Sequence, residues 1–243
     1  MRLERLAPVP QTLEISGYEE LRLIFAAREW RAPSFLLNIV ADAQGRFTGD
    51  AGSSRDISNE ADYQSLIGYR MAADGILTSA GTARSEQYRR SRMAPLALAS
   101  KSGDFSGIPA VELVSAGPVD SLVYLLVKRS QVRRVRARYT QPWVRVVSVG
   151  RGNPFGLTFR LTRLGWRRIL VEAGPSYANW LLANAIIAGI ALTVVGVESD
   201  SPLNAAKPAL DALGVTGAQL ESAEILDGTL FTRWSEISAV KRF

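Results

Sequence analysis

The chain has 243 residues, 47% of them apolar and 21% charged, which is ordinary for a globular protein with a substantial core. It contains no cysteine and no histidine, which excludes disulfides, thiolate nucleophiles, cysteine-ligated zinc and the usual general base near neutral pH. Chemistry in this chain must therefore rely on carboxylates, hydroxyls, backbone amides, Lys, Arg or a bound cofactor.

The net charge of +6 is unevenly distributed along the chain. Twelve Lys or Arg residues lie between Asp120 and Glu172, and no acidic residue does. Such a run could face nucleic acid or phosphate, but few aromatic residues are interleaved for base stacking. A solvated surface is the more frequent explanation of a charge run, so we predict no nucleic-acid partner.

Two segments bear on targeting. Residues 1–10 contain two Arg but no apolar run follows them, so no signal peptide is predicted. Residues 180–197 are apolar and reach the length of a membrane span, but polar and glycine residues interrupt them. A helix followed by a buried strand fits this segment as well, and we expect no membrane span and a cytoplasmic location.

The remaining pattern predicts strands that alternate with helices. Apolar runs of strand length occur at residues 34–41, 75–79, 95–100, 121–127, 144–149, 168–171 and 190–197. Helices are predicted at residues 58–73, 155–164 and 175–187. Ser58 is the expected N-cap of the first helix, where Glu60 and Asp62 complement the helix dipole.

This alternation indicates a mostly parallel central sheet with helices on both faces. Asp227–Gly228 is a strong turn dipeptide and predicts an antiparallel edge hairpin within residues 225–234. We expect residues 31–243 to form a single domain, with residues 1–30 as an N-terminal extension packed on it.

Two strand-to-helix turns have the features of a ligand site. They are Ser79–Thr82 and Glu172–Pro175, and each contains a glycine. Ligands of parallel sheets bind at the carboxyl ends of the strands, where a small residue admits a phosphate close to backbone N–H groups. Either turn alone is more often an ordinary turn, because glycine is the default residue there.

The order and spacing of these segments resemble the reductase domain of the bifunctional deaminase–reductase of riboflavin biosynthesis. The resemblance rests on residues 76–82, on Arg70 before them and on Glu172–Pro175, and it extends from Phe35 to the hairpin. It implies a dihydrofolate-reductase-like three-layer α/β fold, NADPH as the cofactor and a homodimer. The implied activity reduces the ribosyl group of a 5-amino-6-(5-phosphoribosylamino)pyrimidine to ribityl.

The resemblance also implies which residues bind the two ligands. The implied cofactor-binding residues are Val40, Gly81, Thr82, Glu86, Ser100, Glu172, Ala173, Gly174 and Pro175. The implied residues for the phosphorylated substrate are Asn38, Asp42, Gln44, Ser54 and Arg70. Lys101 follows the position expected to meet the 2′-phosphate of NADPH. No side chain is assigned as a proton donor, and no metal is expected.

Two substitutions depart from the family pattern where the pyrimidine is expected. Asp42 stands where the family usually has Ser, and Gln44 stands where it usually has Asp. In an extended strand the two side chains share a face, so Asp42 could supply the missing carboxylate. Alternatively, Asp42 holds the adjacent glycine-rich turn. These departures motivate one alternative, a related reductase with another substrate. A non-catalytic nucleotide-binding protein is a further alternative, against which the retained turns at Gly81–Thr82 and Glu172–Pro175 argue.

Overall fold

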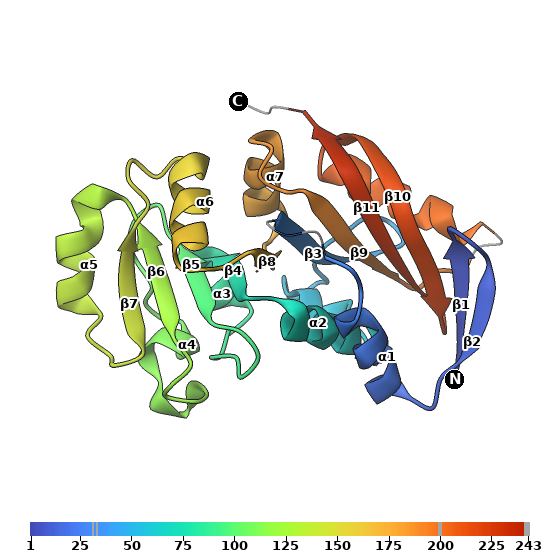
Figure 1. Cartoon of the computed structure of the whole chain (residues 1–243), viewed down its shortest axis with the longest axis horizontal. Helices are drawn as coiled ribbons and strands as arrows, with labels where there is room; N and C mark the ends of the chain where they lie inside the picture. The colour runs from blue at the N-terminus through green and yellow to red at the C-terminus, as the bar shows by residue number, and fades with distance from the viewer. Residues whose placement is uncertain (31, 33, 199–200, 241–243) are drawn as a thin grey trace.

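The structure is a computed structural model that describes residues 1–30, 32, 34–198 and 201–240, and it shows one large sheet with helices on both faces (Figure 1). The strands are β1 (Arg2–Ala7), β2 (Gln11–Glu14), β3 (Ser34–Asp42), β4 (Gly75–Ser79), β5 (Leu96–Ala99), β6 (Val123–Val127), β7 (Val144–Ser148), β8 (Arg168–Val171), β9 (Gly189–Val195), β10 (Val215–Leu226) and β11 (Thr229–Ala239). The α-helices are α1 (Tyr18–Ala26), α2 (Glu60–Ala72), α3 (Ala80–Ser85), α4 (Pro109–Glu112), α5 (Val132–Arg138), α6 (Pro154–Arg163), α7 (Pro175–Ala183) and α8 (Ala206–Ala212). Short 3₁₀ turns are η1 (Ser54–Asp56), η2 (Val114–Ala116), η3 (Arg129–Gln131) and η4 (Pro202–Ala205).

The strands follow the order β2-β1-β10-β11-β9-β3-β8-β4-β5-β6-β7. The seven strands from β9 to β7 run parallel, whereas β11, β10, β1 and β2 are joined by antiparallel pairing. The α/β fold class and the hairpin at Asp227–Gly228 are thereby confirmed. The hairpin is not the edge of the sheet, because β1 and β2 extend the sheet beyond it.

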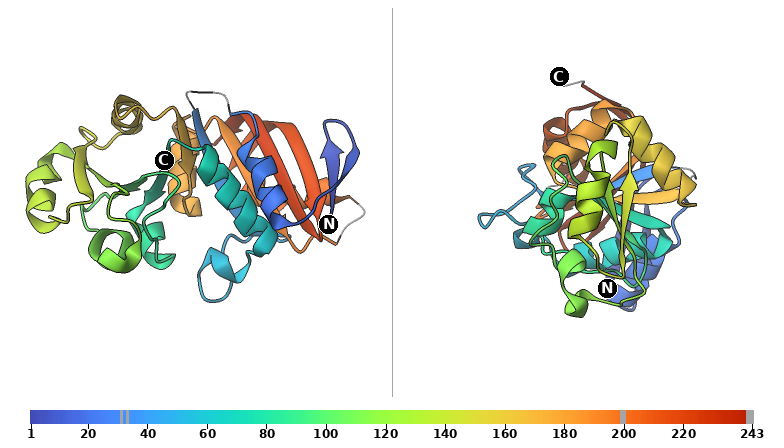
Figure 2. Two further views of the ribbon diagram at one scale, coloured as in Figure 1. Left: turned by 60° about the horizontal axis from the view of Figure 1, so that its bottom comes forward. Right: turned by 90° about the vertical axis from the view of Figure 1, so that its left-hand side faces the viewer.

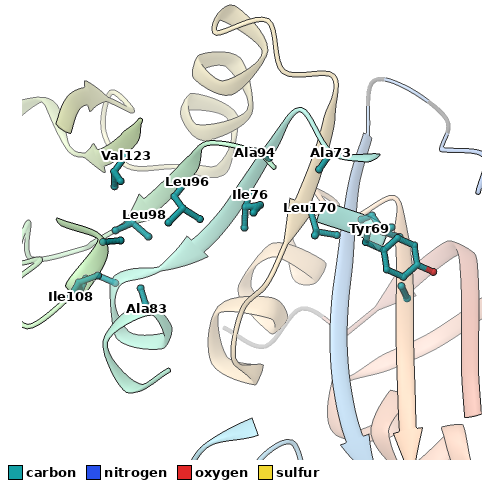
Figure 3. Packing of buried hydrophobic residues seen from close by; sticks show 14 of the residues in the cluster. Tyr69, Ala73, Ile76, Ala83, Ala94, Leu96, Leu98, Ile108, Val123 and Leu170 are labelled. Atoms are coloured by element: carbon teal, nitrogen blue, oxygen red, sulfur yellow. The ribbon is translucent and has the colours of Figure 1, made fainter. Parts of the chain in front are cut away.

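The central strands are apolar on both faces because each face supports its own core. Side chains alternate along a strand, so Ile76 and Leu77 of β4 enter different cores, as do Leu170 and Val171 of β8. Figure 3 shows Ile76, Leu96 and Leu170 along one of these faces. Helices α1 to α5 cover that face and α6 to α8 cover the other, which gives three layers (Figure 2).

Residues 1–30 contribute to the main sheet as well as packing on it. They form β1, which pairs with β10, β2, which pairs with β1, and α1, which lies against α2. Gly68 permits this close approach, because a Cβ atom there would lie 2.5 Å from the carbonyl oxygen of Arg22. The predicted domain boundary at residue 31 lies outside the described residues, and the division itself stays a prediction.

Two predicted helix ends differ from the structure. The N-cap of α2 is Asn59, whose Oδ1 accepts from the backbone N of Asp62 at 3.0 Å. Ser58 instead donates its hydroxyl to the Asp62 carboxylate. Helix α7 ends at Ala183, four residues before the predicted end, and Ala185 follows with φ of 54°. Among the described helices, none has the length and apolar character to cross a membrane.

Arg90 organises the segment that follows β5. The residue is 4% exposed, and its guanidinium donates to five backbone carbonyls, those of Ala110, Leu113, Val114, Gly117 and Pro118. It also stacks 4.2 Å from the centroid of the Trp143 ring. Five donors in a planar fork are a property of arginine alone, so this side chain holds the α4–η2 segment in place.

We expect Arg90→Lys to lower the free energy of unfolding by about 3 kcal/mol, because an ammonium cannot reach all five carbonyls and unpaired buried groups each cost about 1–3 kcal/mol. Denaturant unfolding measures this change. Arg89→Lys is the matched control, since Arg89 makes an exposed hydrogen bond to Ser115, and it should change stability by less than about 0.5 kcal/mol. Equal effects of the two substitutions would contradict the role given to Arg90.

Candidate active site

A cavity of about 570 Å³, here called cavity A, opens at the carboxyl-terminal ends of β3, β4 and β8. Its wall comes from β3, the loop at residues 47–58, one side of α2, residues 82–91 and the turn at residues 172–175. These segments are distant in sequence and meet because β3, β8 and β4 are neighbours in the sheet. This is the position at which parallel sheets commonly bind ligands.

A second hollow of about 360 Å³, here called cavity B, lies beside cavity A at the ends of β5 and β6. One wall contains Tyr177 and Trp180, whose rings stack with centroids 5.6 Å apart. Lys101 and Lys128 also line it, and neither ammonium forms an ion pair with the described residues. Cavity B therefore combines aromatic surface with unneutralised positive charge, which suits an aromatic, anionic ligand.

The two glycine-containing turns are bonded to each other between the cavities. The backbone N of Gly174 donates to Thr82 Oγ1 at 3.1 Å, and the hydroxyls of Thr82 and Ser79 lie 2.9 Å apart. Thr82 and Gly174 line cavity A, whereas Ser79 and Gly81 line cavity B. The bonded turns thus form a partition that an extended ligand would have to cross to fill both cavities.

Neither glycine of this partition is required by the fold. Gly174 has φ of −62°, which other residues adopt readily, and a Cβ atom there would meet only Thr82 Oγ1, at 3.5 Å. A Cβ atom at Gly81 would meet only Ser79 Oγ, at 3.6 Å. Space left open on both sides of the partition is suited to the close approach of a ligand such as a diphosphate.

A buried ion pair stands in the wall of cavity A. Arg70 Nε and Nη2 donate to the two carboxylate oxygens of Glu172 at 2.7 and 2.6 Å, and the Tyr88 hydroxyl donates to Glu172 Oε2 at 2.6 Å. Burial opposes the charge of Arg70, but Glu172 outweighs it and raises the pKa of the guanidinium above its ordinary value. Burial and the adjacent Glu172 raise the pKa of Tyr88 well above its ordinary value. Both hydrogen-bond donors therefore keep their protons.

This ion pair bears on two predicted ligand contacts. Arg70 and Glu172 both line cavity A, but much of their hydrogen-bonding capacity is used within the protein. The contacts account for a carboxylate at the end of a buried strand without any ligand. Binding of substrate by Arg70 and of cofactor by Glu172 stays a prediction.

Glu86 fixes the loop that closes cavity A. Its carboxylate accepts from the Ser53 hydroxyl at 2.8 Å and from the backbone N of Ser54 at 2.9 Å, and its carbonyl accepts from Arg55 at 2.7 Å. The structure thus brings together two predicted site residues, Ser54 and Glu86. Their contact places Ser54 on the cavity wall through a hydrogen bond to its backbone.

The predicted residues of β3 divide into two groups. Asn38 and Val40 line cavity A, whereas Asp42 and Gln44 line neither cavity. Asp42 accepts from the backbone N of Gln44 at 3.0 Å, from that of Arg46 at 2.9 Å, and from the Arg46 guanidinium. Burial opposes ionisation of Asp42, but these hydrogen bonds lower the pKa of its carboxyl below the ordinary value. The structure therefore supports the turn-holding alternative for Asp42, and Gln44 is exposed.

The remaining predicted cofactor residues lie on one or the other side of the partition. Ala173 and Pro175 line cavity A, and Ser100 lines cavity B next to Lys101. Sequence analysis missed Tyr88 and Lys128 altogether and assigned Asp62 only to the helix dipole. No spacing signal singles these residues out, because their place in the cavities depends on packing between distant segments.

The comparisons with known proteins concern the fold. No protein-family model matches the chain, and no curated protein matches it in sequence. Among solved structures, a pyrimidine reductase-like protein from Corynebacterium diphtheriae is 24% identical, with a TM-score of 0.63 over 86% of this chain and 93% of that chain. The riboflavin biosynthesis reductase of Saccharomyces cerevisiae is 13% identical, with a TM-score of 0.56 over 91% and 98%.

A bifunctional protein from Thermotoga maritima, a diaminohydroxyphosphoribosylaminopyrimidine deaminase and 5-amino-6-(5-phosphoribosylamino)uracil reductase, is 14% identical with a TM-score of 0.64. The match covers 84% of this chain but 56% of that one. The fold is that of the riboflavin-pathway reductases. The dihydrofolate-reductase-like fold predicted from the sequence is therefore confirmed, and at these identities the likeness concerns the fold alone.

Glu172→Gln should lower the free energy of unfolding by about 3 kcal/mol, because it leaves the half-buried Arg70 charge without its counter-ion. Tyr88→Phe removes one hydrogen bond to the same carboxylate and should cost about 1–2 kcal/mol. Denaturant unfolding of both variants measures the difference. A Glu172→Gln protein as stable as wild type would show that the ion pair does not hold the cavity wall.

Proposed function

We propose that the chain is an NADPH-dependent reductase that converts the ribosyl group of a 5-amino-6-(5-phosphoribosylamino)pyrimidine to ribityl. The observation that carries this proposal is the partition formed by the two bonded turns, which are joined between Thr82 and Gly174. Its glycines, Gly81 and Gly174, leave open space between the two cavities. A dinucleotide has two aromatic ends joined by a diphosphate, which matches two cavities joined across such a partition. The proposal includes the homodimer implied by the resemblance.

Cavity B is the proposed site of the adenosine half of the cofactor. Its stacked Tyr177 and Trp180 offer aromatic and apolar surface for adenine, and Lys101, beside Ser100, offers charge for the 2′-phosphate. Gly81 and Gly174 would admit the diphosphate at the partition. The residues present therefore fit a phosphorylated dinucleotide.

Cavity A is the proposed site of the nicotinamide and the substrate. When bound, NADPH would supply a hydride to C1′ of the ribosyl group, while the bond between C1′ and the ring oxygen breaks and that oxygen takes a proton from water. Val40 and Gly174 line the cavity and would lie against the nicotinamide, whereas Asn38 and Ser54 offer polar groups to the substrate. The role of the chain is to align the two reactants and exclude water, since no side chain is assigned as a proton donor.

The proposed activity is tested by NADPH oxidation with the phosphoribosylaminopyrimidine, followed by detection of the ribityl product. Formation of that product is the expected result. NADPH binding without product formation would favour a related reductase with another substrate, the alternative motivated by Asp42 and Gln44. Absence of NADPH binding would favour a non-catalytic protein that uses the same fold.

Gly174→Val should weaken NADPH binding at least about 100-fold, because the side chain fills the space through which the diphosphate passes. Thr82→Ala should weaken it about fivefold, as expected for one lost hydrogen bond. Calorimetric titration with NADPH measures both. Gly174→Val should fold normally, since its backbone angles suit valine and a Cβ atom there meets only Thr82 Oγ1, at an ordinary contact distance of 3.5 Å. Unchanged affinity in a folded Gly174→Val protein would contradict the proposed path of the cofactor.

The preference for NADPH over NADH should fall about tenfold in Lys101→Ala, because the lost ammonium pairs only with the 2′-phosphate. The ratio of kcat/KM values for the two cofactors measures this preference. NADH kinetics should be unaffected, and Lys207→Ala, an exposed lysine on α8 outside both cavities, is the control. An equal loss with both cofactors would mean that Lys101 acts on folding instead of on the phosphate.

A further inference from the structure

Asp62 is a buried carboxyl in the wall of cavity A that no intramolecular contact fully satisfies. It lies in the first turn of α2 and is 5% exposed. Its Oδ2 accepts from the Ser58 hydroxyl at 2.6 Å, whereas Oδ1 is buried and forms no hydrogen bond with the described residues. A buried carboxyl oxygen without a donor is costly, and such a group most often persists where function requires it.

A second hydrogen-bond acceptor in the wall of cavity A also lacks a donor among the described residues. Asn38 of β3 lines cavity A, and its side-chain Oδ1 is also buried without a hydrogen bond among the described residues. Asn38 and Val40 point to the face of the sheet that α2 covers, as does Thr193 of β9, which pairs with Val40 in the sheet. The wall of cavity A therefore holds two unsatisfied oxygens, one from the sheet and one from the helix that covers this face of the sheet.

The chemistry of the missing partner follows from these two acceptors. Both oxygens are buried and lack donors among the described residues, so a ligand in cavity A would supply those donors only if side chains of the wall moved aside. Burial raises the pKa of the Asp62 carboxyl above its ordinary value, although hydrogen bonds from the Ser58 and Thr193 side chains favour the charged form and leave Oδ1 without a donor. Adjacent N–H groups of a ligand would stabilise that charged form.

We propose that Asp62 and Asn38 hydrogen-bond the base of the substrate and select a pyrimidinone with an amino group at C2 over the corresponding uracil. This inference rests on the proposed function and decides between the two bases that the proposed reaction allows. A 2-amino-4(3H)-pyrimidinone presents the 2-amino group and N3–H side by side, and both can donate to one carboxylate. A uracil presents O2 in place of the amino group, and its lone pairs would face the carboxylate.

The test compares kcat/KM for the two phosphoribosylamino compounds, the 2,5-diaminopyrimidinone and the 5-aminouracil, in wild type and in Asp62→Asn. Wild type should prefer the diamino compound. Asp62→Asn should lose about 10- to 100-fold with that compound, the size expected for a charge-assisted hydrogen bond. Its loss with the aminouracil should stay below about threefold, because the new amide can donate to O2.

Controls separate this specificity role from a role in folding. NADPH affinity should be the same in wild type and Asp62→Asn, since the cofactor lies toward the partition. Asp120→Asn, an exposed carboxylate outside cavities A and B, should leave both rates unchanged. Asn38→Ala removes the second acceptor and should shift the preference in the same direction, which keeps the inference testable if Asp62→Asn does not fold.

The outcomes distinguish this inference from the proposed function. Turnover of neither compound would overturn the proposed function and this inference with it. Turnover of both, with equal losses in Asp62→Asn or with a wild-type preference for the aminouracil, would overturn the inference alone. A reversal or strong reduction of the wild-type preference in Asp62→Asn would support it.

Discussion

The buried ion pair of Arg70 and Glu172 is the contact on which the geometry of the candidate site depends. It joins the last turn of α2 to the residue after β8, and Tyr88 brings the segment after α3 to the same carboxylate. The backbone N of Glu172 also donates to Leu77 of β4. Three segments of the wall of cavity A therefore converge on one side chain. Because burying two charges is costly, such a pair is better explained by the geometry it imposes than by a gain in stability.

With the end of β8 held in this way, the turn after it meets the turn after β4. Their bond between Gly174 and Thr82 forms the partition, and its glycines stay free of both strain and packing. The same arrangement explains why cavities A and B, the proposed substrate and cofactor sites, are adjacent. Both lie at the carboxyl ends of neighbouring parallel strands, where backbone N–H groups are available and side chains can be small.

The carboxylates near cavity A show how local contacts divide their roles. Asp42 is saturated by donors from its own turn, and Glu86 by the loop at residues 53–55. Glu172 is saturated by Arg70 and Tyr88. Asp62 differs, because one of its oxygens has no donor among the described residues. The hydrogen-bonding capacity that remains for a ligand therefore belongs to Asp62. From its position in the sequence, only a favourable interaction with the helix dipole is predicted for this residue.

The sequence by itself determined the alternation of strands and helices, the hairpin at Asp227–Gly228 and the two glycine-containing turns. These features depend on residues close in the chain, through side-chain periodicity and backbone preferences. Only the tertiary structure decided which strands are neighbours, that residues 1–14 extend the sheet, and that Asp62 lines cavity A while Asp42 does not. Those outcomes depend on contacts between distant segments, such as β3 against β9 and α2 above both, and local pattern carries no information about such contacts.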